Sequence, residues 1–190
     1  MTILPSRAMR SAPGAIIVMG VAGCGKTTVG RLLAGRLAIP YAEADSFHPG
    51  GNITKMSQGL PLTDQDREPW LEAIADRIRH DSRLVVSCSA LKRAYRNILR
   101  QADPPTWFLH LVIDRDIAIA RVAARADHFM PASLVDSQFA DLEPLRGEAG
   151  LTVDAARPPE ELAATALNTL ALTASPRIRP SQPAWPRGSA

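Results

Sequence analysis

Gly20, Gly25, Lys26 and Thr27 have the spacing of a phosphate-binding loop, within the stretch AIIVMGVAGCGKTT that ends at Thr28. The apolar run before the loop is typical of a buried strand, and the apolar spacing after it is typical of a helix face. Glycines permit a tight turn whose N–H groups point inward at a helix N-terminus, which suits polyphosphate. We expect Lys26 to reach the β- and γ-phosphates and the Thr27 hydroxyl to bind Mg²⁺. A glycine turn that matches by chance is the alternative, and both flanking elements argue against it.

The composition indicates one ordinary globular domain. The chain has 190 residues, of which 46% are hydrophobic and 22% charged, with a net charge of +3. The basic residues are scattered and form no dense run, so a phosphorylated small molecule explains them at least as well as nucleic acid. The two cysteines, Cys24 and Cys88, belong to no metal-binding pattern. We expect both to be reduced thiols in a cytoplasmic protein.

The two ends of the chain differ from its middle. No apolar run approaches the length of a membrane span, and the leading residues lack the apolar core of a secretory signal. We expect a flexible arm at 1–14, a folded domain at 15–173 and a proline-rich, disordered tail at 174–190.

Strand and helix patterns alternate along the folded part. Apolar runs predict strands near 16–18, 39–44, 84–86, 107–113 and 151–154, with amphipathic helices between them. This alternation predicts an α/β fold with a parallel five-stranded sheet between two helical layers, joined by right-handed crossovers. With the phosphate loop, it indicates a P-loop NTPase three-layer α/β/α sandwich.

Asp45 follows the second predicted strand, at the sheet edge where open α/β folds place ligands. A helix-capping or loop aspartate is an equally good interpretation. A long polar connection follows at 46–71, in which His48 either caps a turn or holds a substrate, and Lys55 is either an exposed amine or an anion ligand. One short helical segment near 52–56 is predicted there, too polar for the core. Trp70 falls on the apolar stripe of the next helix and is predicted to be a core residue.

Basic residues recur later in the chain. Lys92 and Arg96 begin a helix after the third strand, where they either meet an anionic substrate or form an exposed face. Arg121 and Arg125 share one helix face and precede HFMP, which favours a mobile cover over a nucleotide, with a solvated face as the alternative. His110, inside the fourth strand, is predicted to be a satisfied interior or edge histidine.

The motifs present favour a small-molecule kinase over other P-loop proteins. No NKxD pattern of a GTPase switch occurs, and the third strand ends in Ser-Cys-Ser instead of the acid of an ATPase motor. Three blocks go further: HPGGNITKMSQGLPLTDQDREPWL, VVSCSALKRAYRNILR and HFMPASLVDSQFADLEPL resemble the corresponding blocks of the gluconate kinases. The resemblance covers roughly residues 16–172. It implies ATP-dependent phosphorylation of D-gluconate at its 6-hydroxyl, with Mg²⁺, a helical lid at about 121–135 and a homodimer.

The resemblance also assigns roles to residues. It implies that Lys26, Asp45 and Arg125 are catalytic, with Asp45 accepting the proton of the substrate hydroxyl. Thr27 and Glu43 are implied to hold the metal. The implied nucleotide-binding residues are Gly20, Ala22, Gly23, Cys24, Gly25, Lys26, Thr27, Thr28, Arg121 and Arg125. The implied gluconate-binding residues are Asp45, His48, Asn52, Lys55, Lys92, Tyr95, Arg96, His128 and Gln138.

Four positions depart from the family's pattern. Ala22 and Cys24 replace common serines, which predicts intact phosphate binding by the backbone but activity that is sensitive to thiol modification. Ala44 and Asp127 replace common glycines, and the second bears on the flexibility of the lid. Two alternatives stay open: a kinase of the same group for shikimate or a nucleoside monophosphate, and a silent nucleotide-binding regulator. The HPGGNITKM block argues against the first, and Lys26, Thr27 and Asp45 argue against the second.

Overall fold

The computed structural model describes residues 13–81, 83–124 and 132–174. In this part of the chain a parallel five-stranded sheet has the order β2-β3-β1-β4-β5. Its strands are β1 (Ala15–Met19), β2 (Tyr41–Glu43), β3 (Leu84–Ser87), β4 (Trp107–Val112) and β5 (Gly150–Asp154). The strand that leads into the phosphate loop lies at the centre, where β1 pairs with β3 on one side and β4 on the other.

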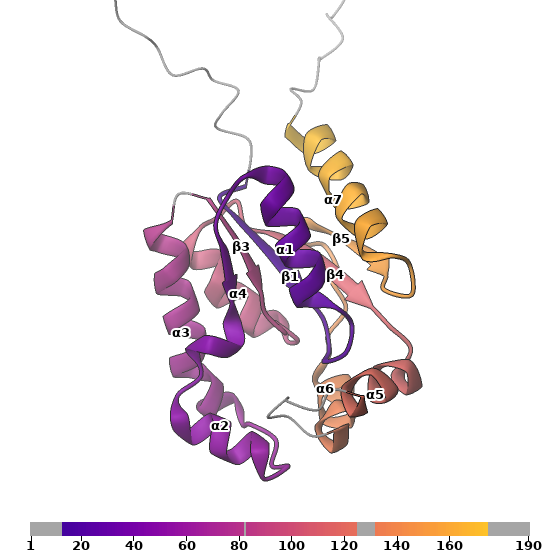
Figure 1. Ribbon diagram of the computed structural model, residues 1–190. Coiled ribbons are helices and arrows are strands. Elements are labelled where there is room, and N and C mark those ends of the chain that lie inside the picture. Colours follow the sequence, from indigo (N-terminus) through magenta and orange to yellow (C-terminus); the bar gives the residue numbers. More distant parts are fainter. Residues whose placement is uncertain (1–12, 82, 125–131, 175–190) are drawn as a thin grey trace, which may run out of the picture.

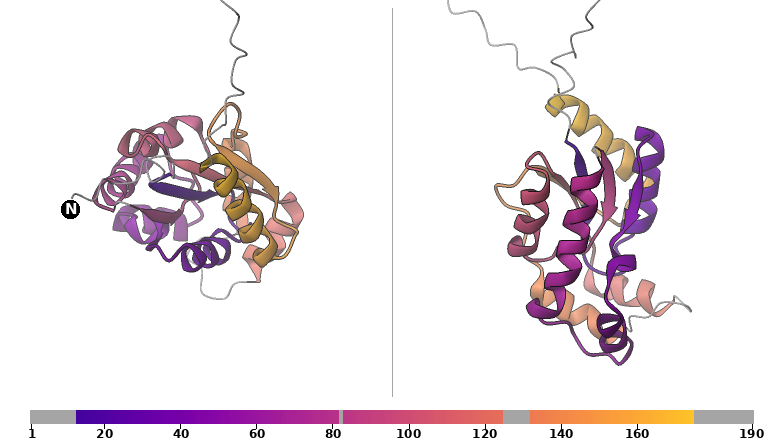
Figure 2. Two further views of the ribbon diagram at one scale, coloured as in Figure 1. Left: turned by 90° about the horizontal axis from the view of Figure 1, so that it is seen from above. Right: turned by 90° about the vertical axis from the view of Figure 1, so that its left-hand side faces the viewer.

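Helices cover both faces of the sheet, as Figures 1 and 2 show. Helices α1 (Lys26–Leu37) and α7 (Pro159–Ala174) pack side by side on one face, and α3 (Asp64–His80) and α4 (Arg93–Ala102) on the other. Because alternate residues of a strand point to opposite faces, Ile16 and Val18 belong to the core on the side of α1 and α7. Ile17 and Met19 belong to the core on the side of α3 and α4. Burial on both faces explains why the strands are continuously apolar.

The remaining elements gather beyond the carboxyl ends of the strands, at the lower end of Figure 1. They are the short helix η2 (Ala44–Phe47), α2 (Gly50–Ser57), α5 (Arg115–Ala123), η3 (Ala132–Leu134) and α6 (Val135–Asp141). This arrangement brings segments from three separate parts of the sequence to the mouth of the phosphate loop.

The predicted fold class and all five strands are confirmed, with ends shifted by one or two residues. The short helix predicted around Asn52 and Met56 is confirmed as α2, but the expectation that it is too polar for the core was wrong, because both side chains are buried. The predicted arm and tail fall outside the described residues except for Pro13, Gly14 and Ala174, and the predicted lid is described only at its two ends. None of the helices in the described segments is both long and apolar enough to span a membrane.

Candidate active site

The phosphate loop is held in shape by close backbone packing. Gly23 has φ of +81°, and a Cβ there would lie 2.6 Å from the carbonyl oxygen of Ala118 on α5. Gly20 has φ of +138°, and a Cβ there would lie 2.6 Å from the carbonyl oxygen of Leu111. Both positions therefore require glycine, because any side chain would push the loop away from β4 and α5.

Polar side chains at the start of α1 and on β2 meet at the corner where the metal is predicted to bind. The Thr27 hydroxyl donates to Glu43 Oε2 at 2.8 Å, and the Tyr41 hydroxyl donates to the same oxygen at 2.5 Å. Burial, followed by the hydrogen bond to Glu43, raises the pKa of Tyr41 to about 12, so it stays a donor. Ser87 Oγ supports the loop from β3 by donating to the Lys26 carbonyl oxygen at 2.9 Å. A hydroxyl beside a carboxylate fits Mg²⁺, which prefers oxygen ligands.

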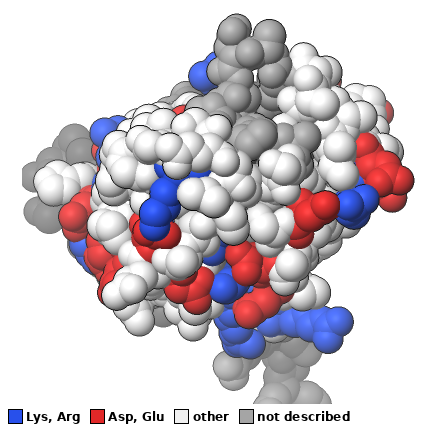
Figure 3. All heavy atoms as spheres, turned by 90° about the horizontal axis from the view of Figure 1, so that it is seen from below, with Lys and Arg blue, Asp and Glu red and all other residues white. Residues whose placement is uncertain are grey.

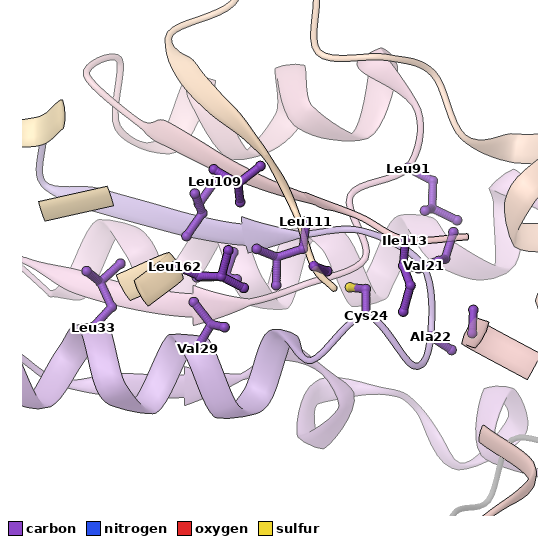
Figure 4. Close-up of a cluster of buried hydrophobic side chains, with 14 of the residues drawn as sticks. Val21, Ala22, Cys24, Val29, Leu33, Leu91, Leu109, Leu111, Ile113 and Leu162 are labelled. Atoms are coloured by element: carbon purple, nitrogen blue, oxygen red, sulfur yellow. The ribbon is translucent and has the colours of Figure 1, made fainter. Parts of the chain in front are cut away.

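Cys24 lies in the loop, but its side chain belongs to the core. Figure 4 shows it directed from the loop into the apolar cluster that contains Leu111, and only 2% of the residue is exposed. Cys24 therefore offers the cleft no side-chain group, which leaves its backbone N–H as the group that would make the predicted phosphate contact. Cys88 is buried as well, and the two cysteines form no disulfide.

Arg121 reaches the loop from α5. Its guanidinium lies 3.4 Å from the carbonyl oxygens of Gly23 and Ala155, between the phosphate loop and the turn after β5. Arg121 thus lies beside the loop, and its contact with the nucleotide stays a prediction. Its predicted partner Arg125 and the predicted substrate residue His128 lie outside the described residues.

Opposite the loop, Asp45 and His48 line the other side of the same cleft. Asp45 is part of η2, directly after β2, and His48 follows that helix. The His48 ring stacks on Trp70 with centroids 4.4 Å apart, and Asn52 Nδ2 lies 3.4 Å from its Nδ1. An amide donor at Nδ1 places the proton of a neutral ring on Nε2. Burial lowers the pKa of His48, although Asp45 opposes this effect.

Arg67 on α3 is the cation on this side. Its Nη1 donates to the Tyr95 hydroxyl at 2.8 Å and lies 3.0 Å from Asp141 Oδ2 on α6. Only 9% of the residue is exposed, so its charge acts in a poorly solvated place. Asp64 completes the group by accepting from Tyr95 at 2.5 Å and from Lys92 at 2.7 Å, and the latter bond raises the pKa of Lys92.

One cleft, open to solvent, joins the two sides. Figure 3 views this end of the molecule and shows charged side chains of both signs interspersed over it. The cleft is lined by Ala22, Gly23, Gly25, Lys26, Thr27, Glu43, Asp45, His48, Met56, Pro61, Leu62, Arg67, Trp70, Ser89, Leu91, Leu134, Ser137 and Gln138.

The structure brings many of the predicted residues to this cleft and leaves others away from it. Ala22, Gly23, Gly25, Lys26, Thr27, Glu43, Asp45, His48 and Gln138 line the cleft. Three further predicted residues do not line the cleft but contact residues near it: Asn52 contacts His48, Tyr95 accepts a hydrogen bond from Arg67, and Lys92 donates one to Asp64. The Gly20 N–H bonds to the Ser89 carbonyl oxygen, and Thr28 is exposed on α1 beside a shallow groove.

Two predicted gluconate ligands are engaged elsewhere. Lys55 Nζ pairs with Asp66 Oδ1 at 2.6 Å on the outer surface. The Arg96 guanidinium is fully buried, pairs with Glu148 at 2.7 Å and donates to the Ala90 and Leu91 carbonyl oxygens. For Arg96 this corrects the prediction: its charge is satisfied inside the protein, where it ties the segment before β5 to α4.

Sequence reasoning missed Arg67. The helix-start pattern TDQD explained the neighbouring carboxylates, and nothing in the spacing distinguished Arg67 from an exposed helix residue. Its place one turn before Trp70, on the buried stripe of α3, was the available signal.

Comparison with known proteins agrees with this geometry. The family model described as shikimate kinase matches residues 22–171. The chain is 46% identical over 132 residues to the thermosensitive gluconokinase of Escherichia coli K12, covering 67% of this chain and 70% of that one. It is 35% identical to the gluconokinase of Arabidopsis thaliana, covering 85% and 94%.

Solved structures give the same result. A gluconokinase from Sinorhizobium meliloti 1021 superposes with a TM-score of 0.79 at 46% identity, covering 87% of this chain and 95% of that one. A shikimate kinase from Aquifex aeolicus superposes with a TM-score of 0.56 at 19% identity, which shows the shared fold. The chain therefore belongs to the gluconokinases, within the family of P-loop kinases that the shikimate kinase model describes.

Proposed function

We propose that the protein transfers the γ-phosphoryl group of Mg-ATP to the 6-hydroxyl of D-gluconate by direct in-line displacement. One observation carries this proposal: a single cleft holds Lys26 and Thr27 on one side and Asp45, His48 and Arg67 on the other. Phosphoryl transfer needs the donor phosphate and the acceptor hydroxyl in one water-poor space.

Different residues of the cleft have different roles in the transfer. Lys26 Nζ, which donates to the Val21 carbonyl oxygen at 2.9 Å, neutralises charge on the β- and γ-phosphates. Asp45 orients the 6-hydroxyl and accepts its proton. Thr27 and Glu43 would hold Mg²⁺, which supplies charge neutralisation between the phosphates when bound.

Arg67 extends the predicted substrate set. A sugar acid presents a carboxylate at one end and hydroxyls along its length, and it needs a cation and alternating donors and acceptors. Arg67 supplies the cation among the lining residues opposite the loop, and the neutral His48 ring supplies an imidazole N–H. We assign the gluconate carboxylate to Arg67, and not to the cations of the predicted substrate set, which are Lys55, Lys92 and Arg96.

A coupled assay of ADP release with Mg-ATP tests the reaction. The acceptors are D-gluconate, shikimate, AMP and related sugar acids. Stimulation by gluconate, with 6-phosphogluconate as product, supports the proposal. Stimulation by another acceptor alone would keep the kinase but overturn its substrate, and nucleotide binding without any transfer would identify a silent regulator. The homodimer that the resemblance implies and the cytoplasmic location inferred from the cysteines stay predictions, the first testable by light scattering.

A further inference from the structure

Helix α6 contacts both sides of the cleft within one turn. Gln138 Oε1 accepts a hydrogen bond from the Ala22 backbone N–H of the phosphate loop at 2.7 Å. Three residues later, Asp141 lies 3.0 Å from Arg67 Nη1 and 3.4 Å from Lys92 Nζ. Residues three apart share a helix face, so one face of α6 contacts both the phosphate loop and Arg67.

The Gln138 contact lies at the γ-phosphate end of the loop. Lys26, whose ammonium reaches the β- and γ-phosphates in such loops, donates to the carbonyl oxygen of Val21, the residue next to Ala22. A phosphoryl oxygen at this end would compete with Gln138 for the Ala22 N–H. A carboxamide carries donors as well as an acceptor, so Gln138 can then donate to that oxygen. The helix then remains attached through the nucleotide, in place of its direct hydrogen bond to the loop.

The Asp141 contact acts on the proposed carboxylate site. Arg67 is nine-tenths buried, and Asp141 and the Tyr95 hydroxyl both engage its Nη1. These contacts fix one edge of the planar guanidinium, so the position of α6 sets how the rest of the group faces the cleft.

We propose that Gln138 and Asp141 are positioning residues that couple the two ligands through α6, so that bound ATP tightens the binding of gluconate. This inference rests on the proposed function and names the residues that connect the ATP site with the gluconate site. Reciprocity requires gluconate to tighten ATP by the same factor.

The test measures gluconate affinity by titration calorimetry on the full-length chain, with and without the Mg²⁺ complex of a non-hydrolysable ATP analogue. For the wild type we expect tightening by about fivefold or more. Gln138→Leu and Asp141→Asn should each reduce this ratio to near one. Asp136→Asn is the matched control, since Asp136 is also on α6 but pairs with Arg115 at 2.7 Å, and it should keep the wild-type ratio.

Gln138→Glu separates coupling from simple support of the loop. Glutamate can still accept from the Ala22 N–H, so loop packing is kept, but it repels a phosphoryl group. We expect this variant to melt like the wild type and to lose the coupling. A wild-type ratio of one, or Gln138 variants that keep the full ratio, would overturn the inference. A wild type that neither binds nor phosphorylates gluconate would overturn the proposed function instead.

Discussion

The imidazole of His48 lies flat on the indole of Trp70, with ring centroids 4.4 Å apart and planes inclined by 10°. The same indole donates its N–H to the carbonyl oxygen of Ala44 at 2.7 Å, immediately before Asp45. Trp70 was predicted to be a core residue, and it is buried to 2% exposure. It also lines the cleft, so one core side chain supports both Asp45 and His48.

Two substitutions of Trp70 separate these roles. Trp70→Phe and Trp70→Leu both leave the Ala44 carbonyl oxygen without its donor, at a cost of about 1–3 kcal/mol in unfolding free energy. Only leucine also removes the stacked ring, worth about 0.5–1.5 kcal/mol. The KM for gluconate should therefore be roughly 2- to 10-fold higher for Trp70→Leu than for Trp70→Phe. Equal KM values would show that the stack does not position His48.

Arg67→Met should weaken gluconate binding selectively. The variant keeps the length of the side chain but loses a charged hydrogen-bonding group, and we expect the KM for gluconate to rise by roughly 10- to 100-fold. The KM for ATP should change little. Arg77→Met is the control, because Arg77 is on the same helix but pairs with Asp81 at the surface. Comparable rises in both KM values would assign Arg67 to the general structure of the site.

Asp45→Asn tests proton acceptance. The amide keeps the size of the side chain and removes its negative charge, so kcat should fall by about 10²- to 10⁴-fold while ATP still binds. Steady-state rates and a nucleotide titration measure the two effects. A kcat within a few-fold of the wild type would mean that Asp45 only orients the hydroxyl.

The sequence predicts local features well because their causes are local. The phosphate loop, the five strands and the apolar stripe of α3 follow from residue spacing alone. Arg67 was missed because its role depends on Tyr95 and Asp141, which the chain brings together only on folding. Asn52 was judged too polar for the core because nothing in the sequence shows that its amide donates to the Asp66 carbonyl oxygen at 2.7 Å. Arg96 was misassigned because a buried partner, Glu148, looks like any surface acid in the sequence.

The structure reverses the prediction of thiol sensitivity. Cys24 and Cys88 are 2% and 1% exposed, and burial raises the pKa of Cys88 to about 12. Since the thiolate is the reactive form, both should react slowly with a disulfide reagent in the native enzyme and quickly in urea. Thiol counting with and without Mg-ATP measures this. Rapid loss of activity with one equivalent of reagent would show that Cys24 becomes accessible in the working enzyme.

His110 predicts how stability depends on pH. The residue is 3% exposed on β4, which confirms its predicted interior position, but neither ring nitrogen has a hydrogen-bond partner among the described residues, so the prediction that it is satisfied was wrong. Burial, with a smaller effect of Arg96, lowers its pKa from 6.5 to about 4. As the pH falls below 6.5, the imidazole therefore binds a proton in the unfolded chain but not in the folded protein. Stability is lost over this range until about pH 4, where the folded protein binds the proton as well.

We expect this histidine alone to cost on the order of 2 kcal/mol of unfolding free energy between pH 7.5 and pH 5. His110→Leu fills a similar volume without a titrating group, so its urea midpoint should fall less over that range. His48, whose pKa is also lowered, keeps part of the pH dependence in the variant. His80→Asn, at an exposed position at the end of α3, should behave like the wild type. An equal loss of stability in His110→Leu and the wild type would mean that other groups, and not this buried ring, set the acid limit.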